Sequence, residues 1–187
     1  MEQENQEIQK KPASRKVFSI VLLCVASLVV VGMILCYFIP KNYAPQIATP
    51  DYVKVYSSNS DGKKYDKGTA VYEKVMTLYN ESFKVTIMDA LLKGRLSDGG
   101  EYVTKTQSNP KSLGDYAIEL CYDSEQTITD RAYDGESKVY LSVVVVVKNT
   151  TELAVVNAYY MSNSSMSRVN YETYAHQSAL YDYLNNL

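Results

Sequence analysis

The chain of 187 residues has no tryptophan, a single histidine (His176) and three cysteines, of which only Cys121 lies beyond residue 40. A lone cysteine in that part cannot form an internal disulfide, and zinc sites draw on several His or Cys ligands. The sequence also lacks a glycine-rich phosphate loop, a G-x-S-x-G elbow and an H-E-x-x-H motif. These shortages argue against zinc, nucleotide and serine-hydrolase chemistry, and we expect no cofactor, no metal and no enzymatic activity.

Charge is missing from residues 17–39, VFSIVLLCVASLVVVGMILCYFI. As a helix this stretch would span roughly 35 Å, enough to cross a hydrocarbon core about 30 Å thick. Secretion signals have shorter apolar regions of about 7–15 residues and end in a small-x-small cleavage site. No such site precedes Pro40. We therefore predict a retained transmembrane helix, with a cleaved signal and a buried helix of a soluble protein as the alternatives.

The basic residues of the two flanks predict the orientation of this span. Lys10, Lys11, Arg15 and Lys16 precede it, whereas Lys41 is the only basic residue close behind it. Because cytoplasmic flanks collect Lys and Arg, the tail of residues 1–16 is expected inside the cytoplasmic membrane and the rest outside. The tail is polar and too short to fold. Gly32 and Cys36 form a weak small-x-x-x-small pair that would suit helix pairing.

The remainder of the chain is long enough for one extracytoplasmic domain, residues 51–187, after a proline-punctuated spacer, residues 40–50. This part is mildly acidic and lies outside the cell, so nucleic acid is not an expected partner. The expected partners are the lipid bilayer, through residues 17–39, and a membrane protein or a cell-wall polymer.

Apolar periodicity predicts the elements of this domain. Tyr72, Met76, Tyr79, Phe83, Ile87 and Ala90 recur at steps of three and four, which predicts one long helix over about 70–93 that stops at Gly94. A polar loop with an Asp-Gly turn is expected at 58–68. A short last helix carries Leu180, Tyr183, Leu184 and Leu187 on its apolar side. Strands are expected at 51–57, 101–107, 115–123, 138–149, 152–161 and 167–174.

The predicted fold class is therefore α+β: an N-terminal transmembrane helix, then a long helix packed on an antiparallel sheet of five or six strands, closed by a short C-terminal helix. Five consecutive valines, residues 143–147, do not alternate with polar residues, which indicates a strand covered on both faces. The long helix would cover one face. The last helix, or else a partner protein bound to an exposed valine patch, would cover the other.

Candidate chemical groups are few. A Cys121–His176 nucleophile pair is conceivable, but Cys121 lies within a predicted strand and nothing near it would activate the thiol. Acidic residues gather in the segment DSEQTITDRAYDGE and could attract calcium or serve a surface hydrolase, although a solvated loop explains them as well. They are Asp123, Glu125, Asp130, Asp134 and Glu136.

Tyrosine is abundant, with eighteen residues against three phenylalanines. Its ring favours strands and its hydroxyl tolerates water, so it suits a sheet with wet edges. Tyr159, Tyr160, Tyr171 and Tyr174 could form a platform for a glycan, a peptide or a teichoic-type polymer. A structural role in ordinary strands is the competing interpretation.

Two segments, LYNESFKVTIMDALLKGRLSDGG (78–100) and YETYAHQSALYDYLNNL (171–187), carry a resemblance. In these segments and in the order of its elements the chain resembles single-pass, membrane-anchored extracytoplasmic proteins of low-GC Gram-positive bacteria. The resemblance implies a bacterial cell-surface setting and no particular activity or site residue. The leading hypothesis is a tethered binding or accessory module. The alternatives are a sensor subunit that signals through a partner membrane protein and, third, a surface hydrolase that uses acidic residues.

Overall fold

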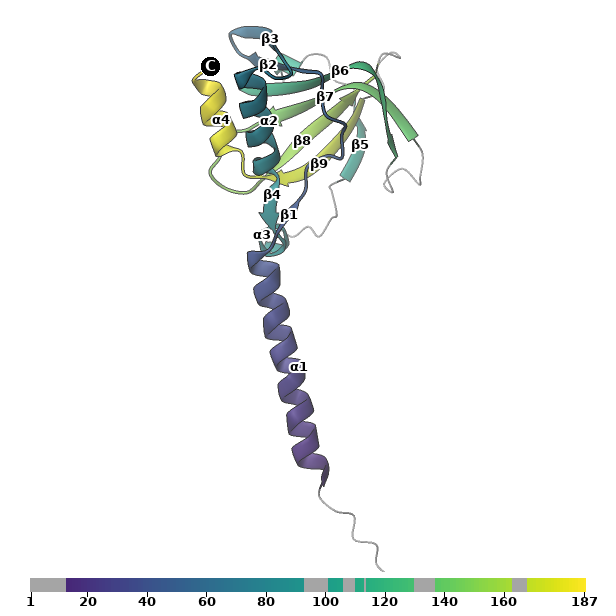
Figure 1. Cartoon of the computed structure of the whole chain (residues 1–187), viewed down its shortest axis with the longest axis vertical. Helices are drawn as coiled ribbons and strands as arrows, with labels where there is room; N and C mark the ends of the chain where they lie inside the picture. Colours follow the sequence, from purple (N-terminus) through teal and green to yellow (C-terminus); the bar gives the residue numbers. More distant parts are fainter. Residues whose placement is uncertain (1–12, 93–100, 106–109, 113, 130–136, 163–167) are drawn as a thin grey trace, which may run out of the picture.

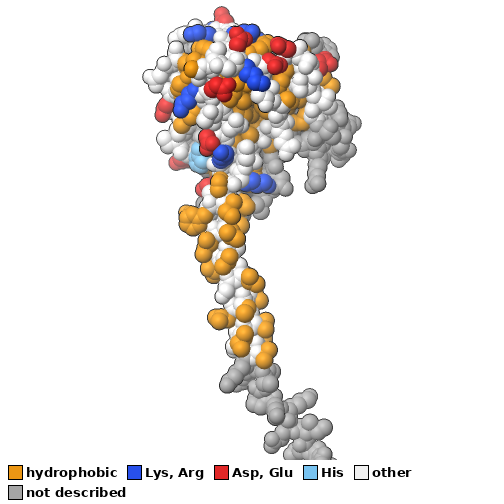
Figure 2. Space-filling view, viewed as in Figure 1, with side chains coloured by type: hydrophobic (Ala, Val, Ile, Leu, Met, Phe, Trp, Pro, Cys, Tyr) orange, Lys and Arg blue, Asp and Glu red, His pale blue; other side chains and the backbone are white. Residues whose placement is uncertain are grey.

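The computed structural model describes residues 13–92, 101–105, 110–112, 114–129, 137–162 and 168–187. Helix α1 (Ala13–Phe38) projects from the base of an α+β domain, and the C-terminus lies at the far end of that domain (Figure 1). Within α1, Val17–Phe38 is long and apolar enough to cross a membrane and is not buried by the rest of the protein. Figure 2 shows the contrast between the apolar rod and the mixed, charged surface of the domain. The predicted apolar helix is confirmed, and by length and composition it fits a membrane anchor or a signal sequence.

The domain contains short helices and nine strands within the described residues. In chain order, its elements are β1 (Pro40–Asn42), β2 (Tyr52–Ser57), β3 (Ser60–Asp66), α2 (Ala70–Ser82), β4 (Lys84–Thr86), α3 (Ile87–Leu92), β5 (Glu101–Lys105), the 3-10 turn η1 (Pro110–Ser112), β6 (Tyr116–Thr129), β7 (Ser137–Val147), β8 (Ala154–Met161), β9 (Arg168–Ala175) and α4 (Ser178–Asn185).

Seven of the strands form one antiparallel sheet in the order β3-β2-β6-β7-β8-β9-β5, and β1 pairs with β4 in a separate two-stranded sheet. Strands β6 and β7 lie at the centre, with Leu120 opposite Val143 and Ile118 opposite Val145. The predicted α+β class is confirmed, and each of the six predicted strands is present. The seventh strand is β3.

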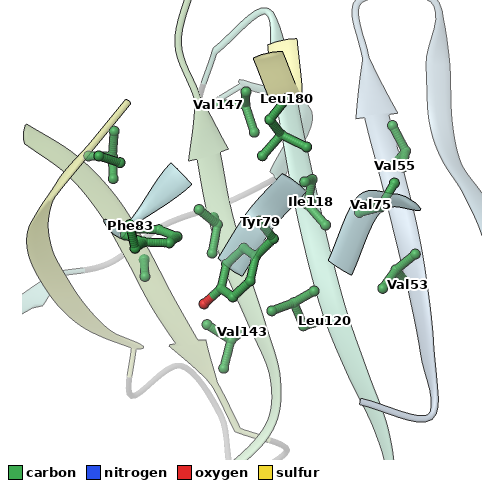
Figure 3. Close-up of a cluster of buried hydrophobic side chains, with 14 of the residues drawn as sticks. Val53, Val55, Val75, Tyr79, Phe83, Ile118, Leu120, Val143, Val147 and Leu180 are labelled. Carbon is green, nitrogen blue, oxygen red and sulfur yellow. The ribbon is translucent and has the colours of Figure 1, made fainter. Parts of the chain in front are cut away.

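Helices α2 and α4 lie side by side on one face of the sheet (Figure 1). This helix face holds the main core, in which Tyr79 of α2 is surrounded by Ile118, Leu120 and Val143 (Figure 3). Leu180 and Leu184 of α4 are also buried here, and Tyr183 is partly buried. Leu187, predicted on the same apolar side, instead lies beyond the end of α4 and is 44% exposed.

All five valines, residues 143–147, are buried, so the prediction of a strand covered on both faces is confirmed. The expectation that α4 covers the second face is wrong, because α4 packs beside α2 on the helix face. On the opposite face, Val144 and Val146 cluster with Ala117 and Tyr159. The backbone at Gly114 lies directly over Val146, since a Cβ there would be 3.1 Å from Val146 Cγ1.

The single long helix predicted over 70–93 is wrong, because α2 ends at Ser82. Phe83, which follows, is fully buried, and the chain then extends as β4 before a new helix, α3, begins. Thr86 and Asp89 cap the start of α3 reciprocally: the Thr86 N–H donates to Asp89 Oδ2 at 3.3 Å, and the Asp89 N–H donates to Thr86 Oγ1 at 3.1 Å. This is the geometry of a capping box. Gly94, the predicted stop, lies outside the described residues.

Residues 58–68 are not simply a polar loop, because Ser60–Asp66 forms the edge strand β3, paired with β2. The predicted Asp-Gly turn is a bulge: the register shifts between Val55 and Tyr56, and Gly62 adopts φ 97°. A Cβ at Gly62 would come within 2.7 Å of the Tyr56 ring. Glycine is therefore favoured here by the backbone conformation, and a larger residue would also displace the Tyr56 ring.

Candidate functional site

The junction between α1 and the domain contains almost no free chain. Ile39 alone separates the end of α1 from β1, and β1 pairs with β4 so that Pro40 lies opposite Thr86 and Lys41 opposite Val85. The end of α1 also contacts α3 and β4. The rod is therefore joined directly to a folded part of the domain.

Residues 43–50, predicted as part of a spacer that lifts the domain off the membrane, are packed against it instead, and we call them the strap. At its start, the Tyr43 N–H donates to the Phe83 carbonyl at 3.0 Å, and the Tyr43 carbonyl accepts from Thr173 Oγ1 at 2.7 Å. Tyr43 is 4% exposed and meets Tyr174 edge to face at 5.9 Å. Pro45 and Pro50 are buried as well.

Tyrosine hydroxyls from distant elements hold the rest of the strap. Tyr122 of β6 donates to the Ala48 carbonyl at 2.7 Å, and the Ala48 N–H donates to the Tyr140 hydroxyl of β7 at 3.4 Å. Tyr72 of α2 donates to the Pro50 carbonyl at 2.6 Å. The strap has no regular strand pairing in this stretch, so these hydroxyls satisfy backbone groups of Ala48 and the buried carbonyl of Pro50.

The same hydroxyls belong to a buried group that we call the tyrosine cluster: Tyr72, Tyr79, Tyr122, Tyr140, Tyr160 and Tyr171. Neighbouring rings meet edge to face, with centroids 5.4 Å apart for Tyr122 and Tyr140 and 5.2 Å apart for Tyr140 and Tyr160. This is a favourable arrangement for aromatic pairs. Within the cluster, Tyr79 has a buried hydroxyl with no hydrogen-bond partner in the described part of the chain.

Burial changes the acidity of these phenols. It raises the pKa of Tyr72, Tyr122 and Tyr140, and for Tyr140 the hydrogen bond from the Ala48 N–H partly opposes the rise. Burial also places the pKa of Tyr79 well above its usual value, with smaller contributions from neighbouring tyrosines. A phenolate in a low-dielectric interior lacks the water that would stabilise its charge. These phenols are therefore neutral near pH 7.

On the opposite face of the sheet, a second polar group surrounds Glu119, which has 14% of its side chain exposed. Its carboxylate accepts from Tyr56 at 2.6 Å and from Ser142 Oγ at 2.8 Å, and Lys54 Nζ lies 3.5 Å away. Burial and the bond to Glu119 raise the pKa of Tyr56. Burial alone would lower the pKa of Lys54, but the adjacent carboxylate reverses this and raises it. Sequence reasoning missed this cluster, since its members come from three strands.

Cys121 and His176 do not meet. Cys121 is buried in β6, whereas His176 is exposed just after β9, with β7 and β8 between the two strands. Burial, and then the Glu119 charge, raise the pKa of Cys121 to about 12. The thiol is therefore protonated near neutral pH and is a poor nucleophile.

The residue next to His176 has a structural role that the sequence did not reveal. Gln177 is fully buried; its Nε2 donates to the Val146 carbonyl at 3.1 Å, and its Oε1 accepts from the Lys148 N–H at 3.0 Å. The β7–β8 pairing ends at Val145 opposite Ala158. Gln177 therefore provides hydrogen-bond partners for backbone groups at the end of β7 and fixes the start of α4 against the sheet.

Of the predicted acidic segment, Asp123 and Glu125 are exposed on β6, and the Asp123 N–H donates to Asp51 Oδ2 at 2.9 Å. Asp130, Asp134 and Glu136 lie outside the described residues. Among the described side chains, no group of three or more His, Cys, Asp or Glu residues is arranged to hold a metal ion.

The predicted tyrosine platform is not an open surface, because Tyr159, Tyr160, Tyr171 and Tyr174 are all buried. Tyr160 and Tyr171 point into the helix-face core, whereas Tyr159 packs on the opposite face with Val144. Tyr174 packs with Tyr43 of the strap. Their burial agrees with the alternative interpretation, in which these tyrosines have a structural role.

Comparisons with known proteins give no relative from which a role could be carried over: no protein-family model, no curated protein and no solved structure matches the chain.

Proposed function

We propose that this protein is a single-pass membrane protein of a bacterial cell envelope and that its domain is a binding or accessory module outside the cytoplasmic membrane. Residues 17–39 remain in the bilayer, and the tail of residues 1–16 stays in the cytoplasm. The module acts on a partner that lies at the membrane surface.

Two features support the membrane assignment and its orientation. The rod exposes apolar side chains along Val17–Phe38. This exposure would be unfavourable in water but is favourable in lipid. Four basic residues, Lys10, Lys11, Arg15 and Lys16, precede the span, and Lys41 alone follows it closely. This asymmetry favours a cytoplasmic N-terminus.

The observation that carries the choice of partner is the bonded strap. A free segment of eight residues would let the domain move outward by roughly 25 Å. The strap is instead fixed through Tyr43, Ala48 and Pro50, and β1 is paired with β4. The domain is thus held next to the end of its own span. It can contact only partners that lie within about one domain length of the membrane. A membrane protein fits this reach better than a distant wall polymer does.

Paired reporter fusions test the membrane assignment. Alkaline phosphatase fused after Leu187 is active only outside the cytoplasm, and a green fluorescent protein fused there fluoresces only inside. We expect an active phosphatase fusion that stays with the membrane fraction after a carbonate wash. A fluorescent fusion with an inactive phosphatase would reverse the orientation, and phosphatase released in soluble form would identify a cleaved signal.

The same junction supports a second candidate, a sensor subunit. The strap is hydrogen-bonded to the tyrosine cluster and is joined to α1 through β1. A change in the core could therefore move the span, which would signal through a partner helix. Gly32 and Cys36 would form the pairing face. Oxidative crosslinking in membranes tests it: a Cys24→Ser variant, which keeps Cys36, should give a disulfide-linked dimer or a crosslinked partner. A chain that stays monomeric under these conditions would remove this candidate.

A further inference from the structure

The short helix α3 follows β4 at the base of the domain, beside the end of α1 (Figure 1). We infer that α3 is a second membrane contact, lying in the headgroup region of the leaflet from which the domain emerges, with phospholipid as its ligand. The inference rests on the proposed function, because it requires that α1 stays inserted in the bilayer.

The strand register fixes the depth of α3. Pro40, two residues beyond the end of α1, lies directly opposite Thr86. Paired Cα atoms in an antiparallel ladder lie about 4.5–5.5 Å apart. Because α3 begins at the next residue, Ile87, its first turn lies at the level where the membrane span ends. A segment at that level meets the boundary between headgroups and acyl chains.

The composition of α3 suits this boundary. Its sequence, Ile-Met-Asp-Ala-Leu-Leu, has one polar residue, and Ile87 and Met88 each keep a minor part of their surface exposed. The one charge, on Asp89, is turned back onto the start of the helix, where its carboxylate accepts from the Thr86 hydroxyl and N–H. The exposed parts of Ile87 and Met88, beside an inserted span, are favourable in lipid and unfavourable in water.

The bilayer is the occupant that the geometry favours over a protein, because α3 contacts the end of α1 itself and any partner there would first have to displace lipid from the span. Docking α3 would also restrict how the domain tilts about the junction at Ile39. The domain would then present a fixed side to its partner.

Tryptophan fluorescence tests the inference cleanly, because the chain has no tryptophan of its own. The full chain is reconstituted in phosphatidylcholine vesicles as three single-tryptophan variants. Met88→Trp reports on α3, Leu28→Trp on the middle of the span, and Tyr65→Trp on β3 at the far end of the domain. Each is measured with lipids that carry a spin label near the headgroup, with lipids labelled at the chain end, and with aqueous iodide.

We expect Met88→Trp emission to be blue-shifted relative to Tyr65→Trp and quenched most by the shallow spin label. Leu28→Trp should be quenched most by the deep label, and Tyr65→Trp by iodide. If Leu28→Trp responds as expected but Met88→Trp is quenched mainly by iodide, the inference on α3 is overturned and the membrane assignment stands. If Leu28→Trp itself is quenched mainly by iodide, the membrane assignment fails.

Two checks keep the result interpretable. Ile87→Trp serves as a second reporter on the same turn, and far-UV circular dichroism confirms that each variant folds. Blue-shifted Met88→Trp and Ile87→Trp emission without quenching by either lipid label would mean that protein, not lipid, covers α3, and would overturn the inference as well.

Discussion

At the scale of single residues, tyrosine performs two different tasks in the same core. Tyr72 and Tyr122 use their hydroxyls to bind carbonyls of the strap, whereas Tyr79 contributes only its ring and leaves its hydroxyl buried without a partner in the described structure. Composition predicted that tyrosine would combine a strand-favouring ring with a polar tip suited to the wet edges of a sheet. It could not show which rings meet the strap, because those partners lie 22 to 92 residues apart in sequence.

Matched tyrosine-to-phenylalanine substitutions separate these tasks. Tyr72→Phe and Tyr122→Phe each leave a strap carbonyl without its donor, so we expect each to lower the free energy of unfolding by about 1–2 kcal/mol. Tyr79→Phe removes a hydroxyl that already lacks a partner, so it should leave stability unchanged or raise it. Urea unfolding of the full chain in detergent, followed by circular dichroism, measures all three. A loss for Tyr79→Phe equal to that for Tyr72→Phe would contradict the assignment.

At the scale of elements, the sequence predicted those with a strong apolar pattern and misjudged those defined by partners. The stripe from Tyr72 to Ile87 continued past the true helix end because Phe83, which is buried, lies at the helical spacing of four residues after Tyr79. One local signal marked the break: Thr86 and Asp89 are spaced as a capping box, which indicates a new helix start. This spacing indicates two helices, with the second one beginning after Thr86.

Strand β3 and the strap were missed for a related reason. SDGKKYD has almost no apolar residue, so no apolar alternation indicates a strand. Its lysines are typical of an edge strand, where they prevent pairing with other chains. The strap carries prolines and alanines typical of a linker, and only hydrogen bonds to β6, β7, β9 and α2 turn it into part of the domain. Neither feature is encoded locally.

The valine strand β7 provides a test at this scale, because neighbouring positions face opposite sides of the sheet. Val144→Ala and Val145→Ala should each lower the free energy of unfolding by about 2 kcal/mol, since both side chains are 0% exposed. Val139→Ala, in the same strand but 45% exposed, should stay within about 0.5 kcal/mol of the parent. The comparison uses the same urea assay. A negligible loss for Val144→Ala would mean that the face opposite the helices is open.

At the scale of the whole molecule, an apolar rod and a tyrosine-rich α+β domain form one connected unit rather than two bodies on a flexible linker. The fold class, the rod and all six predicted strands could be read from hydropathy and periodicity. The short, paired junction could not, because it depends on pairing between β1 and β4, more than forty residues apart. This junction is also what narrows the proposed partner to the membrane surface.

The tyrosine cluster gives the molecule a defined response to alkali. The pKa values of Tyr72, Tyr79, Tyr122 and Tyr140 are raised in the folded state, so above about pH 10 the unfolded chain releases protons that the folded chain retains. This contribution to stability is fully present below that pH and is lost as pH rises further. Tyrosinate absorbance at 295 nm should therefore rise in a cooperative step that coincides with loss of circular dichroism. Ionisation of all eighteen tyrosines while the fold persists would contradict the burial of the cluster.

The central claim, a retained span with the domain outside the cell, is tested most directly by labelling one exposed cysteine in intact cells. Ser58→Cys lies in the exposed turn between β2 and β3, and the background has Cys24, Cys36 and Cys121 replaced by serine or alanine. A membrane-impermeant maleimide should label a band of the full 21.1 kDa chain without cell lysis. Labelling that requires lysis would place the domain inside, and a labelled band shortened by the first 39 residues would show that the apolar helix is removed.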